Sequence, residues 1–247
     1  MTKIIIDEIR KLIQKNKPGL TDKQKTRLYK IINPDIKDYK IYGTRVAVIE
    51  KIVKKALIKL NCSFADAIEI FRELISANIE EEKIAGFLFL NRFKKYFDEN
   101  IPSLIRDEYI IHCHTWSVLD STCIRVIGPF LAKKGNEELA KQVIEDWSDS
   151  QNIWIKRGSM VILLKIFMLK KEIDMKFLSH LVEKLLIYSS ENYIEKGIGW
   201  LIRTCSKIDP DQISDYLIKN KDNFTRLILR NGSEKLSKER REIILEK

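Results

Sequence analysis

The chain has 247 residues, of which 45% are hydrophobic and 32% are charged, so it can bury a sizeable core and wholesale disorder is excluded. Nine Gly and five Pro are too few for the many tight turns of an all-β protein, and this scarcity favours helices. The 45 Lys and Arg against 35 Asp and Glu give a net charge of +10, which can steer a protein toward polyanions but does not identify a partner.

Cysteine usage and hydropathy indicate a cytoplasmic protein. The N-terminal segment carries charges every few residues, unlike the apolar centre of a signal peptide. No run approaches the roughly 20 apolar residues of a membrane span, so we expect no membrane association. The four cysteines are too widely scattered for a disulfide framework: Cys62, Cys113, Cys123 and Cys205.

The first two predicted helices are separated by a Lys-Pro-Gly break. Apolar residues recur at helical spacing in residues 2–15, and a second helix is predicted over residues 22–32. Asn33-Pro34 ends it, because the residue before a proline avoids the helical region. Residues 38–44 are predicted to form a loop, with Thr44 as the cap of the next helix.

From residue 44 onward, predicted helices recur in pairs. The longer ones begin near residues 44, 80, 116, 152, 191 and 224, a period of about 33–39 residues. The first ends near Leu60, and the last runs from about residue 223 to the C-terminus. This period predicts an all-α fold, an α-solenoid of HEAT-like antiparallel helix pairs that forms a single domain over residues 1–247. In such a fold, one helix of each pair lines a concave surface; an irregular helical bundle is the alternative.

The segment Thr-Trp-Ser-Val-Leu-Asp at residues 115–120 is the first candidate for chemistry. Trp116 and Asp120 share one helix face, so a flat π surface lies beside a carboxylate. This pairing suits a cationic ligand, or a transition state that gains positive charge. A lone Trp usually packs in a core, but a buried unpaired Asp is costly. We therefore expect this face to reach water, a cation or a ligand.

Two later segments carry similar side chains. Trp154 precedes Arg157, and Trp200 precedes Arg203; positions one repeat apart should become neighbours along one inner surface. The structural alternatives are core packing for Trp154, as for Trp147, and an ion pair between Arg157 and Asp120 or another acid. The two glycines of Gly-Ile-Gly-Trp at residues 197–200 indicate either a tight helix contact or a ligand beside the backbone.

Other familiar catalytic signatures are missing. In His112-Cys113-His114 adjacent side chains point apart, and no second Cys/His pair stands at ligand spacing. The chain has no phosphate-binding glycine loop, no nucleophile elbow and no His-Glu-x-x-His pair. We therefore expect neither a metal nor a cofactor. The C-terminal third is rich in Lys and Arg, and a subset that points inward could neutralise phosphates.

Three ordered motifs resemble one known family. Residues 116–121, Trp-Ser-Val-Leu-Asp-Ser, resemble Trp-Asp-x-Val-Asp-Ser, with Ser117 in place of Asp. Residues 148–157, Ser-Asp-Ser-Gln-Asn-Ile-Trp-Ile-Lys-Arg, are similar to Ser-x-Asn-x-Trp-x-x-Arg. Residues 196–203, Lys-Gly-Ile-Gly-Trp-Leu-Ile-Arg, are similar to Lys-x-Ile-Gly-Trp-x-Leu-Arg. This set resembles the AlkD-like DNA glycosylases. Residues 42–45 are also similar to that family's aromatic-Gly-x-x-Thr-Pro entry to a helix, without the proline.

The resemblance implies a monomeric HEAT-like solenoid that holds duplex DNA in a basic concave groove. It implies excision of cationic N3- and N7-alkylated purines by hydrolysis of the N-glycosidic bond, without deep flipping of the base. By motif position, the catalytic residues would be Asp120, Trp116 and Trp200. The implied DNA-binding residues are Arg157, Lys156, Arg203, Arg230 and, as the best match for an N-terminal Tyr, Tyr29.

Two non-catalytic functions remain as alternatives at this point. A HEAT-like DNA-binding protein would keep a basic groove without turnover and would bind duplex DNA in a salt-dependent way. A protein-interaction scaffold would have no duplex affinity at moderate salt and would carry apolar residues on its concave face.

Overall fold

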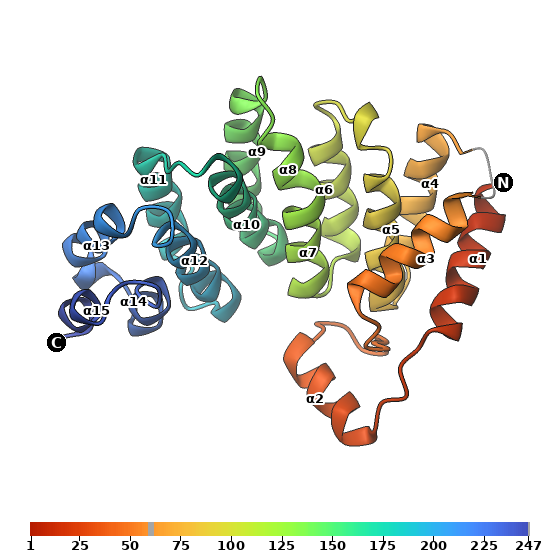
Figure 1. The fold of residues 1–247 in the computed structure, drawn as a ribbon, viewed down its shortest axis with the longest axis horizontal. Helices are drawn as coiled ribbons and strands as arrows, with labels where there is room; N and C mark the ends of the chain where they lie inside the picture. Colours follow the sequence, from red (N-terminus) through yellow and green to blue (C-terminus); the bar gives the residue numbers. More distant parts are fainter. Residues whose placement is uncertain (59–61, 247) are drawn as a thin grey trace. The chain divides into compact units, whose positions relative to one another are not determined.

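The computed structural model describes residues 1–58 and 62–246, and they form two compact units, residues 1–126 and 127–247. Regular structure in the described residues is helical, apart from one isolated bridge between Lys40 and Ile79 (Figure 1). The predicted all-α class is therefore confirmed. Each unit is described separately below, and the prediction of one continuous domain over residues 1–247 stays a prediction.

The first unit stacks its helices in two rows. In one row, α3 packs against α5 and α5 against α7; in the other, α4 packs against α6, while α1 covers α3 and α4. Helix α2 stands off from the stack and is joined to it by two loops (Figure 1). The bounds are α1 (Thr2–Lys15), α2 (Asp22–Ile32), α3 (Val46–Ile58), α4 (Phe64–Ile75), α5 (Glu80–Asn91), α6 (Ile101–His112) and α7 (Trp116–Thr122).

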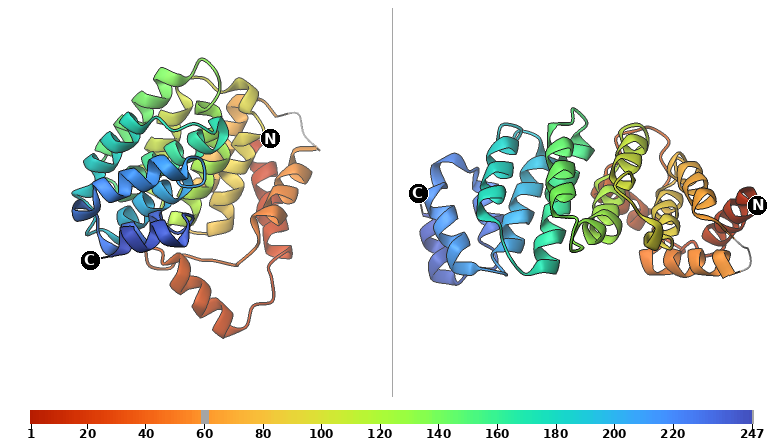
Figure 2. Two further views of the ribbon diagram at one scale, coloured as in Figure 1. Left: turned by 60° about the vertical axis from the view of Figure 1, so that its left-hand side comes forward. Right: turned by 90° about the horizontal axis from the view of Figure 1, so that it is seen from above.

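The second unit repeats this arrangement. Helices α8, α10, α12 and α14 pack in succession, and α9 and α11 form the facing row with the pair α13 and α15. Figure 2 shows the blue and cyan helices of this unit standing side by side as antiparallel pairs. The bounds are α8 (Gly128–Leu131), α9 (Glu137–Asp149), α10 (Ile153–Lys170), α11 (Met175–Leu186), α12 (Asn192–Cys205), α13 (Pro210–Lys219), α14 (Arg226–Gly232) and α15 (Lys238–Leu245).

The long helices begin within about two residues of the predicted starts, and side-chain caps begin three of them, α7, α10 and α14, whereas α5 and α12 begin without one. Asn152, for example, accepts hydrogen bonds from the backbone N–H groups of Trp154 and Ile155 at 2.9 and 3.2 Å. A polar side chain that accepts from the first turn also begins α2, α4, α7, α11, α13, α14 and α15: Thr21, Ser63, Thr115, Asp174, Asp209, Thr225 and Ser237. This agreement supports the solenoid-like reading of each unit.

Three helix boundaries differ from the prediction or lie outside the described residues. Thr44 is not the cap of α3, because its hydroxyl is buried without a hydrogen-bond partner in the described chain, while its N–H donates to Glu81. The predicted last helix is broken into α14 and α15, since Ser237 caps a new helix after Gly232. The predicted end of the helix near Leu60 lies outside the described residues.

Candidate active site and nucleic-acid interface

Helix α7 carries the first two candidate residues. Thr115 begins it: its hydroxyl accepts from the N–H of Val118 at 3.3 Å. Trp116 is the first helical residue and is half-buried, whereas Asp120, one turn later, is only 7% exposed. The predicted pairing of an indole and a carboxylate on one helix thus places the acid in a nearly dry setting. Low local dielectric strengthens the attraction of such a carboxylate for positive charge.

The indole of Trp116 is held from the side of α2. Its Nε1–H donates to the carbonyl of Ile31 at 3.1 Å, in the last turn of α2. Beside it, the N–H of Asp35 donates to the carbonyl of His114 at 3.3 Å, and the His114 Nδ1 lies 2.9 Å from a carboxylate oxygen of Asp35. Burial lowers the pKa of His114, while Asp35 opposes that shift. The loop after α2 is therefore fastened to the segment that leads into α7.

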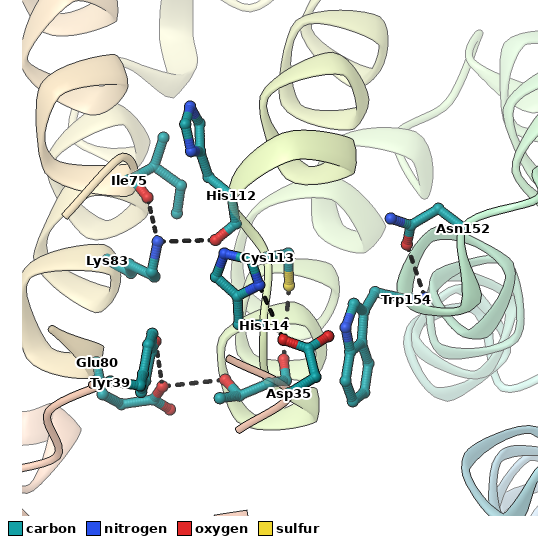
Figure 3. Close-up of polar contacts among 11 residues, drawn as sticks. Asp35, Tyr39, Ile75, Glu80, Lys83, His112, Cys113, His114, Asn152 and Trp154 are labelled. Atoms are coloured by element: carbon teal, nitrogen blue, oxygen red, sulfur yellow. Dashed lines mark hydrogen bonds and ion pairs between the residues drawn. The ribbon is translucent and has the colours of Figure 1, made fainter. Parts of the chain in front are cut away.

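A buried carboxylate lies beneath this junction. Glu80, the first residue of α5, is 2% exposed, and its Oε2 accepts from the Tyr39 hydroxyl at 2.8 Å and from the Thr115 hydroxyl at 3.0 Å (Figure 3). Burial raises the pKa of Glu80, and the hydroxyls that donate to it oppose that shift. Glu80 thus connects the loop after α2 to the start of α7.

Two further ionic residues on α5, Glu81 and Lys83, bind backbone groups of other segments. Glu81 Oε1 accepts from the N–H groups of Tyr42, Gly43 and Thr44 at 3.0, 2.7 and 3.1 Å. Lys83, fully buried, donates to two carbonyls at helix ends, that of Ile75 in α4 and that of His112 in α6 (Figure 3). Burial lowers the pKa of Lys83 to about 8. The first turn of α5 is therefore a buried ionic framework.

Tyr29 uses its hydroxyl inside the first unit. It donates to the carbonyl of Tyr39 at 3.0 Å and accepts from the N–H of Ile41 at 2.9 Å. Its ring packs beside a small cluster of Ile32, Tyr39 and Ile41. This geometry makes Tyr29 a brace of the loop after α2.

In the second unit, Arg157 and Trp154 lie at the start of α10. Trp154 is 3% exposed and packs on Tyr193, with ring centroids 4.8 Å apart, so its core alternative is confirmed. Arg157 is 6% exposed, and its Nη1 donates to the carbonyl of Tyr193 at 2.6 Å. The guanidinium is thereby held against the first turn of α12.

Lys156 differs from its expected role as a phosphate contact. It is 5% exposed, its ammonium donates to the carbonyl of Ser148 at 2.8 Å, and it lies 4.0 Å from the ring centroid of Tyr188. Ser148 stands in the last turn of α9, so the cation stabilises that helix end. Lys156 therefore supports the start of α10, and its contact with DNA stays a prediction, as does that of the equally buried Arg157.

Trp200 lies on α12 and is half-buried. The glycines before it mark tight helix contacts, one of the two predicted explanations. A Cβ on Gly197 would lie 2.6 Å from the Cε of Met160 on α10, and a Cβ on Gly199 would lie 2.8 Å from the Cβ of Asn231 on α14. Trp200 is thus carried by a helix pressed between two others.

The two arginines of the C-terminal third are more accessible. Arg203 is paired with Glu234 at 2.8 Å, with about a third of each side chain exposed. Arg230, on α14, is exposed. The structure therefore brings Trp116 and Asp120 together on α7, and Arg157 together with the first turn of α12. Convergence of these two groups on one groove stays a prediction.

Two features of the described residues concern metal ions and membranes. Among these residues, no cluster of three or more His, Cys, Asp and Glu side chains is arranged to hold a metal ion. In the His112-Cys113-His114 stretch, Cys113 is buried and His114 contacts Asp35. None of the described helices is both long and apolar enough to cross a bilayer.

A comparison with protein-family models identifies the family of this chain. The model for DNA alkylation repair enzymes matches residues 10–236. The chain belongs to the DNA alkylation repair enzyme family. The match spans all three motifs, in agreement with the resemblance to AlkD-like proteins, and it assigns the chain a role in DNA repair. A search of the curated proteins found no match.

In this member of the DNA alkylation repair enzyme family, three buried ionic residues that the sequence pattern did not indicate lie on α5. Glu80, Glu81 and Lys83 belong to a run of Glu-Glu-Glu-Lys, which is typical of a solvated first turn. All four residues of the run are buried. One available signal was position: the run begins a helix of the predicted row, one repeat before Trp116.

Proposed function

We propose that this chain is a DNA glycosylase that removes cationic N3- and N7-alkylated purines from duplex DNA. One observation carries the proposal: Asp120 is nearly buried one helical turn from the half-buried Trp116, in a chain of the DNA alkylation repair enzyme family. A carboxylate kept in such surroundings is suited to a transition state whose positive charge grows.

The chemistry needs little more than this carboxylate. An alkylated purine of this kind already carries a positive charge and leaves as a neutral base when the bond from C1′ to its nitrogen breaks. The charge then moves onto the deoxyribose, where Asp120 stabilises it. A water molecule adds to C1′ and loses a proton. In the proposal, Trp116 and Trp200 hold the sugar and phosphate edge by CH–π and cation–π contacts.

Charge supports the DNA-binding part of the proposal. The net charge of +10 favours association with a polyanion. Arg157 is proposed as a groove residue on its motif position, with its guanidinium fixed by the bond to the Tyr193 carbonyl. Arg230 and Arg203 are proposed as phosphate contacts, whereas Tyr29 and Lys156 contribute by bracing the elements that carry the site.

The decisive experiment compares Asp120→Asn with the unmodified protein on duplex DNA that contains N7-methylguanine. We expect release of the methylated base by the unmodified protein, and at least a tenfold slower release by the variant, about 1.4 kcal/mol of transition-state stabilisation. Asp107→Asn is the matched control, because Asp107 is an exposed carboxylate, 64% accessible, on the neighbouring α6. Equal rates for Asp120→Asn and the unmodified protein would contradict the role of Asp120.

Binding measured at several salt concentrations separates catalysis from DNA association. We expect Arg230→Gln to lower the slope of log affinity against log salt by about one, because one phosphate contact is lost. Arg203→Gln should change it less, since Glu234 already pairs with Arg203. Salt-dependent binding without base release would identify a non-catalytic DNA-binding protein, and absence of duplex binding would favour a protein-interaction scaffold.

A further inference from the structure

We propose that Glu80 is a positioning residue for the α7 site. It is connected to Trp116 in two ways: on the backbone side through the Thr115 cap of α7, and on the indole side through the loop after α2. The kinetic part of the inference rests on the proposed glycosylase activity. Its structural part concerns the environment of the Trp116 indole and is testable without any turnover.

The backbone side of the argument concerns one hydroxyl. Thr115 has a single O–H hydrogen, and it is donated to Glu80 Oε2 at 3.0 Å. The lone pairs of the same oxygen are then directed to the N–H of Val118 at 3.3 Å. Glu80 therefore sets the orientation in which Thr115 caps α7. The start of α7 in turn sets the directions of Trp116 and, one turn later, Asp120.

The indole side passes through the loop after α2. The Tyr39 hydroxyl donates to the same Glu80 oxygen at 2.8 Å, and the Tyr39 carbonyl accepts from the Tyr29 hydroxyl at 3.0 Å. Tyr29 belongs to α2, whose Ile31 carbonyl accepts from the Trp116 indole at 3.1 Å. Hydrogen bonds joined by short covalent segments thus connect Glu80 to the Trp116 indole through the loop after α2, and to the start of α7 through Thr115.

Burial makes this circuit specific. Glu80, Tyr39 and Thr115 are 2%, 3% and 0% exposed, so water cannot readily replace a lost bond. Glu80 also lies at the first position of α5, where the helix dipole favours a carboxylate. Its other oxygen, Oε1, has no hydrogen-bond partner among the described residues. The hydroxyls of Tyr39 and Thr115 therefore converge on Oε2, and the Ser117 hydroxyl also interacts with this carboxylate.

The kinetic test is a double-mutant cycle on Glu80→Ala and Thr115→Val, measured as single-turnover base release from methylated duplex DNA. Displacement of a reacting group by about 1 Å can cost about 100-fold in rate. We expect each single variant to slow release about 10- to 100-fold, with duplex affinity changed less than about threefold. The double variant should be no slower than the slower single variant, because both changes break the same connection.

Two further variants distinguish the loss of this connection from a general folding defect. Thr115→Ser retains the hydroxyl and should restore release to within about threefold of the unmodified rate. Glu73→Gln removes an exposed carboxylate, 53% accessible, from the ion pair with Arg10 and should leave the rate unchanged. Additive losses in the double variant, or a Thr115→Ser variant as slow as Thr115→Val, would overturn the proposal.

The structural test follows the indole N–H signals by NMR, with the Trp116 signal assigned by Trp116→Phe. We expect the Trp116 signal to shift or broaden in Thr115→Val and in Glu80→Ala. The signal of Trp147, buried in the second unit, should stay in place. An unmoved Trp116 signal in both variants would overturn the positioning role. If the unmodified protein released no base, the glycosylase proposal would fail and this measurement would still decide the role of Glu80.

Discussion

The two tryptophans of the proposed site are held by opposite kinds of interaction. Trp116 begins a helix whose cap is bonded to a buried carboxylate, and its indole donates to a backbone carbonyl. Trp200 lies within a helix that is fixed by glycine contacts against Met160 and Asn231. The first arrangement depends on charge and hydrogen bonding, the second on volume. Variants in the two units should therefore fail for different reasons.

The largest expected loss of stability comes from a substitution that breaks the polar arrangement of the first unit. Glu81→Ala removes the acceptor of three backbone N–H groups, at Tyr42, Gly43 and Thr44, in a part-buried loop. Because buried donors without partners are costly, we expect a loss of about 3–5 kcal/mol in the free energy of unfolding. Urea unfolding followed by circular dichroism measures it. The exposed control Glu73→Ala should lose less than about 0.5 kcal/mol.

The second prediction concerns the pH dependence of stability, to which Lys83 of the first unit contributes. The pKa of Lys83 is about 8 in the folded protein and 10.5 in its ordinary state. Between these values the unfolded chain binds more protons, so the Lys83 contribution to stability rises with pH. The gain is on the order of 2–3 kcal/mol between pH 8 and 10.5.

Lys83→Met provides the control for that titration. The variant should be less stable at pH 7, because the carbonyls of Ile75 and His112 lose their donor. The difference in unfolding free energy between the unmodified protein and the variant, measured by urea unfolding at pH 7 to 10.5, should widen as pH rises. A constant difference would contradict the lowered pKa.

The smallest effect concerns volume in the second unit. Gly199→Ala puts a methyl group 2.8 Å from the Cβ of Asn231, an atom fixed to the backbone of α14. We expect a loss of about 1–2 kcal/mol, since overpacking outweighs the better helix propensity of Ala. Gly197→Ala meets the flexible end of Met160 and, at 3.4 Å, the Nη1 of Arg157; both are side-chain ends that can move, so it should cost less. Thermal unfolding of both variants measures the contrast; equal losses would contradict it.

Repeat spacing and capping residues made most of the helices predictable. The predicted starts near 80, 116 and 152 lie within a residue of α5, α7 and α10, because caps and helical periodicity are local. The break between α14 and α15 was not predicted: the cap at Ser237 is a local signal, but the close packing of Gly232 against Ile202 joins distant segments. Trp116 and Asp120 were found because residues four apart share a helix face.

The buried ionic turn of α5 marks the limit of that approach. By itself, the sequence determined the all-α class, the order of the helices and the motifs that led to the DNA alkylation repair enzyme family, because these depend on neighbours along the chain. Only the tertiary structure decided that Glu80 serves Thr115 and Tyr39, and that Lys156 turns inward to Ser148. Burial arises from contacts between distant segments. The sequence around a charged residue therefore does not show whether water or a helix end lies beside its side chain.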